Sequence, residues 1–196
     1  MKLMHRFFAE IDEKWKRTGG EPIRLQIIGS AALMLQTDYE RGTKDGDILE
    51  AEEITPAVRE QLLALAGPQS PLFQKYRMYI EVVRKAILFW PQGPVFHKVE
   101  ELSLKNFSVE VLDVTDVVVS KIKRLNQNDI DDIKAMAGKK LLDQKRLVSR
   151  FESAVDLFSA DARAEDLPRY IKNLNRVERD FLGATESKIE LPDWMQ

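Results

Sequence analysis

The amino-terminal third of the chain alternates between helical and strand-like patterns of apolar residues. Within residues 1–18, apolar side chains recur every three or four positions with charges between them, which predicts an amphipathic helix ending at Gly19-Gly20. The β-branched run Ile23–Ile28 predicts a strand that stops at Gly29, and Ser30–Thr37 predicts a helix with Ser30 as its N-cap. A strand therefore runs directly into a helix at Gly29-Ser30.

The rest of the chain divides into a mixed region and a helical region. Residues 47–49, 75–90 and 107–112 have strand-like patterns, and residues 56–65 predict a helix that begins with proline. From Thr115 onward the spacing is helical, with expected N-caps at Thr115, Asn128, Asp143 and Asp166 and an expected C-cap at Gly138. We therefore predict an α+β fold, with a mixed β-sheet core and flanking helices over residues 1–114. A C-terminal helical region, residues 115–196, is expected to pack on that core.

Composition narrows the chemistry that this fold can carry. The 196 residues include no cysteine and two histidines, and the formal net charge is -2. Thiolate nucleophiles and cysteine-based metal sites are excluded, so any metal is expected to be a hard cation held by carboxylates. The amino terminus lacks the pattern of a signal peptide, and no apolar run reaches the length of a membrane span. We expect a cytoplasmic protein without a membrane partner.

Residues 27–49 contain the residues with the clearest chemical meaning. Gly29-Ser30 places backbone N–H groups and a hydroxyl at the positive end of a helix, where an anion such as phosphate is favoured. Asp45 and Asp47 occupy alternate positions of an expected strand and so share a face, where two carboxylates can bind a divalent metal. Arg41 and Lys44 lie in the connecting loop, where they can offset phosphate charge. Asp-Gly is also a hairpin-turn signal, so a plain turn is the alternative interpretation.

Taken together, these residues resemble the nucleotidyltransferase superfamily of the polymerase-β type. The resemblance rests on Gly29-Ser30, on the segment Thr-Lys-Asp-Gly-Asp-Ile-Leu at residues 43–49, and on a later block at residues 120–133. It is strongest to the minimal bacterial branch that includes abortive-infection and toxin–antitoxin nucleotidyltransferases. Gly46 stands where the superfamily usually has an apolar residue, and Asn128 stands where it has arginine.

The resemblance implies further site residues. It implies a third carboxylate on a strand beside the aspartate pair, for which Glu81 is the first choice and Glu110 the alternative. It also implies a lysine in the later block, Lys121, as a further nucleotide-binding residue beside Gly29, Ser30, Arg41 and Lys44. A solvated position on the outer face of its helix is the alternative for Lys121. Asp129 and Asp132 could orient Lys121 or simply complement the helix dipole.

The expected activity is transfer of a nucleoside monophosphate from an NTP to a hydroxyl, with Mg²⁺ or Mn²⁺ on Asp45 and Asp47 and with Asp45, Asp47 and Glu81 as catalytic residues. The acceptor would be RNA, such as a tRNA, or a partner protein, and the resemblance implies a toxin–antitoxin or stress setting with a toxin or antitoxin partner. An excess of bases over residues 121–150 is typical of a nucleic-acid contact. The alternative is a catalytically silent binding or antitoxin module.

Overall fold

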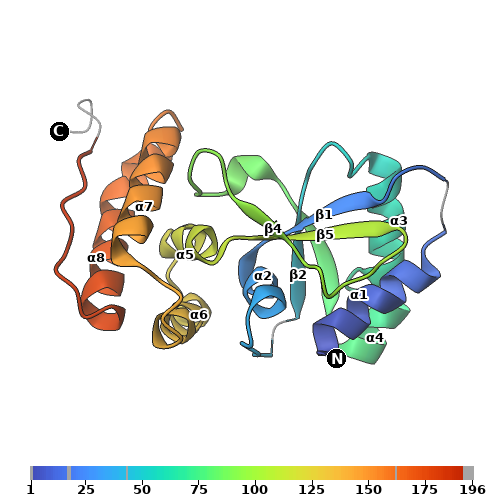
Figure 1. Ribbon diagram of the computed structural model, residues 1–196. Helices are drawn as coiled ribbons and strands as arrows, with labels where there is room; N and C mark the ends of the chain where they lie inside the picture. The colour runs from blue at the N-terminus through green and yellow to red at the C-terminus, as the bar shows by residue number, and fades with distance from the viewer. Residues whose placement is uncertain (1, 17–18, 43, 162, 192–196) are drawn as a thin grey trace. The chain divides into compact units, whose positions relative to one another are not determined.

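A computed structural model describes residues 2–16, 19–42, 44–161 and 163–191 (Figure 1). The chain forms two compact units. The α/β unit contains residues 1–87 and 96–112, and the helical unit contains residues 88–95 and 113–196. The chain therefore passes from the first unit into the second and back before it finally leaves the sheet. That the two units pack together stays a prediction.

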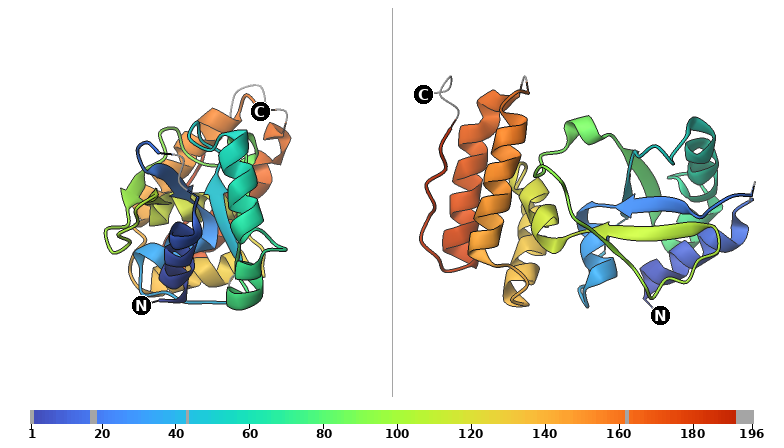
Figure 2. Two further views of the ribbon diagram at one scale, coloured as in Figure 1. Left: turned by 90° about the vertical axis from the view of Figure 1, so that its right-hand side faces the viewer. Right: turned by 45° about the horizontal axis from the view of Figure 1, so that its top comes forward.

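The α/β unit is built on a five-stranded mixed sheet in the order β3-β2-β1-β5-β4. Its strands are β1 (Ile23–Ile27), β2 (Asp45–Leu49), β3 (Tyr79–Val83), β4 (Phe96–Lys98) and β5 (Phe107–Leu112). β1 pairs in parallel with β5, and the two run side by side in the right-hand view of Figure 2, while β2 pairs in parallel with β3. β1–β2 and β4–β5 are antiparallel. The α+β fold with a mixed sheet is thus confirmed.

One face of this sheet is apolar and the other is polar. The helices α1 (Leu3–Lys14), α2 (Gly29–Gln36), α3 (Pro56–Ala66) and α4 (Pro71–Tyr76) form one layer, because α1 contacts each of the others. Side chains on the face under these helices are fully or almost fully buried, as for Leu25, Ile27, Ile48, Ile80 and Val109. Because side chains alternate along a strand, the opposite face presents Gln26, Asp47, Glu81 and Glu110. We call it the polar face.

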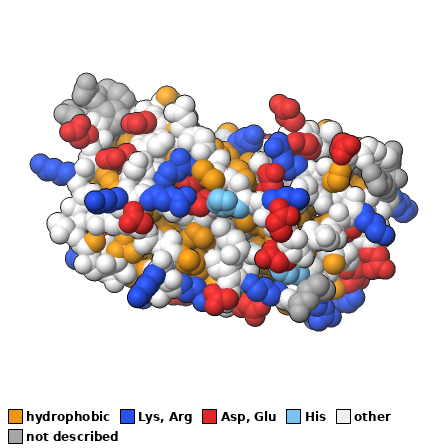
Figure 3. Space-filling model, in the orientation of Figure 1, with side chains coloured by type: hydrophobic (Ala, Val, Ile, Leu, Met, Phe, Trp, Pro, Cys, Tyr) orange, Lys and Arg blue, Asp and Glu red, His pale blue; other side chains and the backbone are white. Residues whose placement is uncertain are grey.

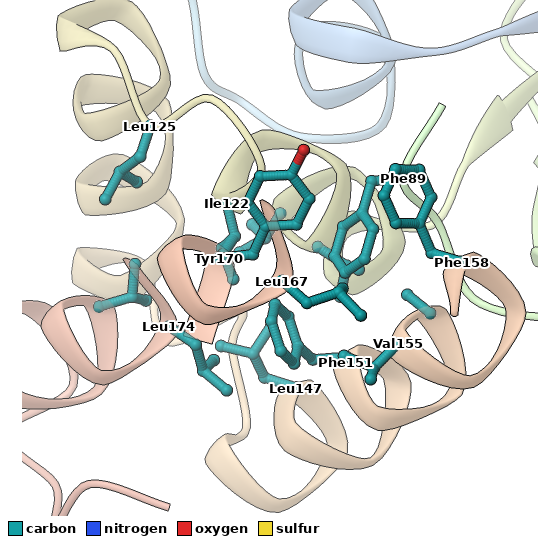
Figure 4. Close-up of a cluster of buried hydrophobic side chains, with 14 of the residues drawn as sticks. Phe89, Ile122, Leu125, Leu147, Phe151, Val155, Phe158, Leu167, Tyr170 and Leu174 are labelled. Carbon is teal, nitrogen blue, oxygen red and sulfur yellow. The ribbon is translucent and has the colours of Figure 1, made fainter. Parts of the chain in front are cut away.

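The helical unit contains α5 (Val114–Ile122), α6 (Gln127–Gly138), α7 (Gln144–Phe158) and α8 (Leu167–Phe181), with a 3₁₀ turn, η2, at Ala164–Asp166. Phe89 lies in its core, where its ring makes edge-on contacts with those of Phe151, Phe158 and Tyr170 (Figure 4). The centroid distances are 5.1–5.5 Å, in the range where aromatic pairs attract.

The segment that carries Phe89 is also held to the helical unit by a buried carboxylate. Asp116 accepts hydrogen bonds from the Val95 amide at 2.9 Å and from two guanidinium nitrogens of Arg150 at 2.7 and 2.6 Å. Arg150 in turn donates to the Gly93 carbonyl at 3.0 Å. Residues 88–95 therefore belong with the helices although they lie between strands β3 and β4 in sequence.

The strand predicted over residues 75–90 is largely wrong. Residues 71–76 form α4, only residues 79–83 form a strand, and residues 85–87 form the 3₁₀ turn η1. The hydroxyl of Ser70 accepts a hydrogen bond from the Phe73 amide at 3.1 Å, and Pro71 follows it at the first helical position. Ser-Pro at this place starts a helix, which outweighed the β propensity of the residues that follow.

Other boundaries differ by a few residues. α5 is capped by Asp113 rather than Thr115, and α6 begins with a capping box formed by Asn126 and Asp129 rather than at Asn128. The short strand β4 was not predicted. Because β4 has three residues, it is too short for its alternation to be visible in the sequence.

The surface is mixed in charge. Figure 3 shows lysine and arginine side chains interspersed with aspartate and glutamate over the visible face, in line with the near-balanced composition. Within the described part of the chain, no helix has both the length and the apolar character needed to cross a membrane.

Candidate nucleotidyl-transfer site

The turn from β1 into α2 has the geometry expected for an anion cradle. Gly29 opens α2 with φ at +64°, a left-handed conformation that glycine adopts without strain. The N-cap of α2 is Ile28, which has no polar side chain to cap the first turn, so Ser30 lies inside the helix and is not the predicted N-cap. The first-turn N–H groups of α2 are therefore not capped by a side chain of the N-cap residue, as an anion site requires.

This turn directly adjoins the second aspartate. The Ile28 amide donates to the Asp47 carbonyl at 2.9 Å, and a Cβ added to Gly29 would lie only 2.9 Å from Oδ2 of Asp47. A side chain at position 29 would occupy the space next to the carboxylate. The glycine thus serves both the left-handed turn and the close approach of the cradle to Asp47.

Three predicted carboxylates lie on one face of two neighbouring strands. β2 and β3 pair in parallel with Asp45 opposite Tyr79 and Asp47 opposite Glu81. Residues directly opposite in a pair point to the same face, so Asp45, Asp47 and Glu81 share the polar face. Asp45 and Glu81 are exposed and Asp47 is half-buried. The Asp-Gly-Asp segment is thus part of a strand and not the hairpin turn of the alternative interpretation.

The pKa of Tyr79 reflects the negative charge of these carboxylates. A hydrogen bond with Asp45, burial and the negative charges of Asp45, Glu81 and Asp47 raise its pKa to about 12. Each of these causes disfavours a phenolate beside carboxylates. Sequence reasoning missed Tyr79, although it lies two residues before Glu81 in the same strand, and alternation alone would have placed the two on one face.

Glu110, the alternative third carboxylate, is further away. It lies on β5, which is separated from β2 by β1, and it is paired in register with Gln26. The Gln26 side-chain amide donates to Glu110 Oε2 at 3.2 Å. Glu81 is therefore the acidic residue that the sheet places beside Asp47, and its catalytic role stays a prediction.

The connecting loop brings one of its two predicted cations to the cradle. The Nη2 of Arg41 donates to Ser30 Oγ at 2.8 Å, so the guanidinium lies at the start of α2. Lys44 precedes Asp45, is exposed, and lines a cavity together with Arg41. Thr43, part of the motif, lies outside the described residues.

Lys121 has a different environment from the one expected. Its amine contacts Asp129 Oδ1 at 3.1 Å and Asp132 Oδ2 at 2.7 Å, and the side chain is 6% exposed. The lysine is therefore not on a solvated outer face, and its role in nucleotide binding stays a prediction. The contacts support both roles considered for Asp129, because it binds Lys121 and Arg124 and also accepts a hydrogen bond from the Asn126 amide at the start of α6.

Arg124, in the turn after α5, provides a guanidinium partner for Asp129. It binds Asp129 with two nearly parallel hydrogen bonds of 2.9 Å, which is the strong geometry for this pair. Burial alone would raise the pKa of Asp129, but the hydrogen bonds from Arg124 and the charge of Lys121 outweigh it and lower that pKa. Although Asn128 stands where the superfamily has arginine, Asp129 still has a charged partner in Arg124, five positions before it in the chain.

The donor set on the polar face fits a hard divalent cation. Carboxylate oxygens are the ligands that Mg²⁺ and Mn²⁺ prefer, and Asp45, Asp47 and Glu81 supply them. Among the residues that the structure describes, no three acidic or histidine side chains are already grouped closely enough to hold a metal. The carboxylates would have to rotate toward one another, beginning with Asp45, which is bonded to Tyr79.

The mixed sheet contains the Gly-Ser turn and the Asp-x-Asp strand on which the resemblance to nucleotidyltransferases rests. A family model described as "nucleotidyltransferase of unknown function (DUF6036)" matches residues 5–179, and the chain belongs to that family. Comparisons with curated proteins and with solved structures gave no match.

Proposed function

We propose that this protein is a metal-dependent nucleotidyltransferase that transfers a nucleoside monophosphate from an NTP to a hydroxyl group. The observation that carries the proposal is the register of β2 and β3, which puts Asp45, Asp47 and Glu81 on one face, with Asp47 against the Gly29 turn. An anion cradle next to a set of carboxylates is the arrangement needed to hold a triphosphate and its metal.

Each residue has a role in this proposal. The first-turn amides of α2, the Ser30 hydroxyl and the Arg41 guanidinium would bind the phosphate tail, with Lys44 adding positive charge nearby. Asp45 and Asp47 would hold Mg²⁺ or Mn²⁺, which supplies neutralisation of phosphate charge when bound. Lys121 was predicted as a further phosphate ligand, and it would first have to leave Asp129 and Asp132.

The reaction forms one bond and breaks one. The acceptor oxygen bonds to the α-phosphorus, the bond from that phosphorus to the β-phosphate breaks in line, and pyrophosphate leaves. The acceptor proton passes to a carboxylate, for which Glu81 is exposed and placed beside Asp47, and from there to solvent.

We propose as acceptor the hydroxyl of an RNA end, such as that of a tRNA, or of a partner protein, in a cytoplasmic toxin–antitoxin or stress system. The excess of basic residues over positions 121–150 supports an RNA acceptor. Incubating the protein with each α-labelled NTP, and with total RNA or with lysate protein, identifies both substrates.

The test compares carboxylate variants in that assay. Asp45→Asn combined with Asp47→Asn is expected to reduce transfer by more than about a hundredfold, since even outer partners of a metal are worth about 10–100-fold. Glu81→Gln should also impair transfer, whereas the matched change Glu110→Gln, on the same face, should not. Mn²⁺ binding followed by paramagnetic resonance gives a second readout. Full transfer by the double variant refutes the mechanism.

The second candidate is a catalytically silent nucleotidyltransferase-like binding or antitoxin module. Two observations favour it. Among the described residues, no three acidic or histidine side chains are grouped closely enough to hold a metal, and Asp45 is hydrogen-bonded to Tyr79. NTP binding without transfer to any RNA or protein, unchanged in the Asp45→Asn, Asp47→Asn double variant, would support this module over the enzyme.

A further inference from the structure

A cavity of about 430 Å³ lies on the helix-covered side of the sheet, away from the carboxylates. Its walls come from the start of α1, from α2, from the loop before β2 and from the connection between α4 and β3. Pockets for small molecules are commonly about 300–1,000 Å³. The cavity is thus large enough for a ligand of modest size.

The cavity and the carboxylates lie along the same edge of the sheet but involve different residues. Lys44 and Met78 line the cavity, and the residues that follow them, Asp45 and Tyr79, lie on the polar face. Lys44 and Met78 immediately precede β2 and β3, so the cavity lies where these two strands begin. Its lining includes none of Asp45, Asp47 and Glu81.

The charge of the lining selects an anion. Four cationic residues contribute to it, Lys2, Arg41, Lys44 and Arg77, against the single acid Glu40. Lys2 is already bound to the carbonyls of Met34 and Thr37, and Arg41 to Ser30. Lys44 and Arg77 are both exposed, and they are the cations at the rim best placed to meet a ligand.

Arg77 is held in a conformation that arginine rarely adopts. It ends α4 with φ at 57° and ψ at 25°, a left-handed position that usually carries glycine. Lys140, after α6, has the same conformation with φ at 58°, so the conformation alone does not mark a ligand site. Arg77 bears on the cavity because its exposed side chain lines it.

The remaining lining is apolar and adaptable. Met4, Met34 and Met78 contribute thioether side chains, and Tyr76 contributes an aromatic ring. Methionine sulfur makes favourable contacts with flat aromatic groups, and arginine stacks on them. The ligand should therefore combine an anionic group with a flat, largely apolar body.

We propose that this cavity binds an organic phosphate with a flat body, of the class of a nucleoside monophosphate, at a site distinct from the carboxylates. The phosphate meets Lys44 and Arg77 at the rim, and the body lies among the methionines. Because Arg41 lines the cavity and also binds Ser30, a ligand in the cavity would affect the contact between Arg41 and the start of α2.

The experiment measures AMP binding by calorimetry in EDTA, so that divalent cations are absent. Arg77→Gly is expected to weaken binding at least tenfold while leaving the melting temperature unchanged or higher, since glycine relieves the left-handed strain. The matched control Arg84→Ala removes an exposed arginine just beyond the other end of β3 and should bind as the unaltered chain does.

The proposal is overturned by AMP binding that is undetectable at millimolar concentration, by binding that Arg77→Gly leaves unchanged, or by binding that is lost in the Asp45→Asn, Asp47→Asn double variant. Adenosine and inorganic phosphate serve as partial ligands. Each is expected to bind more weakly than AMP, and equal binding by either would refute the combined anionic and flat ligand.

Discussion

At the scale of single residues, Gly29 links backbone conformation to the chemistry of the site. Its φ of +64° disfavours any side chain, and the direction in which a Cβ would point is occupied by Asp47 Oδ2. A larger residue here has two separate costs, strain in the backbone and displacement of the carboxylate. The two can be separated by experiment.

Gly29→Ala is expected to lower the free energy of unfolding by about 1–2 kcal/mol, because of left-handed strain, and to weaken Mn²⁺ binding and transfer by moving Asp47. Gly93→Ala is the matched control, since Gly93 has φ at +60° with open space around it. Urea denaturation should show a similar loss of stability in both variants. If Mn²⁺ binding and transfer are equally preserved in both, Gly29 does not position Asp47.

At the scale of elements, α5 and α6 are joined by a buried network of charges. Lys121 and Arg124 of α5 and the turn after it meet Asp129 and Asp132 of α6, and both aspartates are fully buried. Removing one partner of the buried pairs made by Lys121 would leave an uncompensated charge in the interior.

Lys121→Met is expected to destabilise the protein by about 3–5 kcal/mol, because it leaves Asp132 and part of Asp129 unpaired in the interior. Lys145→Met, at an exposed position of α7, is the control and should change stability by less than about 0.5 kcal/mol. Denaturant titration measures both. A stable Lys121→Met variant that has lost NTP affinity would instead restore the predicted phosphate-binding role.

The same network predicts a pH dependence. The folded pKa of Asp129 lies below its unfolded value of 3.8, so its contribution to stability is present above pH 3.8 and is lost as the pH falls through the folded pKa. Asp129→Asn should therefore be less stable than the unaltered chain at pH 6, and the difference should shrink on acidification below pH 3.8. A difference that stays constant in thermal melts down to pH 2.5 would contradict this cause.

At the scale of the whole molecule, the chain crosses between units within residues 88–95. Phe89 sits in the helical core among Phe151, Phe158 and Tyr170, while the strands before and after it belong to the sheet. The helical core therefore depends on a residue that comes from the middle of the α/β sequence. A single boundary in the sequence between the α/β unit and the helical unit would separate Phe89 from the helical core.

Phe89→Ala should lower the free energy of unfolding by about 3–5 kcal/mol, since it leaves a cavity among three aromatic rings. Ile87→Ala, two residues earlier and 53% exposed, is the control for which little change is expected. Calorimetry and tryptophan fluorescence measure both. Equal stability of the two variants would mean that the helical core does not need Phe89.

Much of the candidate site could be found from the sequence because its parts are local. Strand alternation put Asp45 and Asp47 on one face, and the glycine between a strand and a helix identified the cradle. Glu81 was the first choice over Glu110, but that Glu81 lies on the strand beside Asp47 and Glu110 does not needed the strand order, since β1 lies between β2 and β5. The partners of Lys121 could not be predicted from the sequence. Helical periodicity shows which side of the helix carries the lysine, but not which residues of other elements lie against it.

By itself, the sequence determined the α+β class, the Gly-Ser turn, the aspartate pair and most helices, because each depends on residues within one or two turns of chain. Only the tertiary structure decided that Glu81 and Tyr79 lie beside the aspartates, that Arg77 and Lys44 line one cavity, and that Phe89 joins the helices. These depend on strand order and packing between distant segments, which periodicity within a segment does not contain.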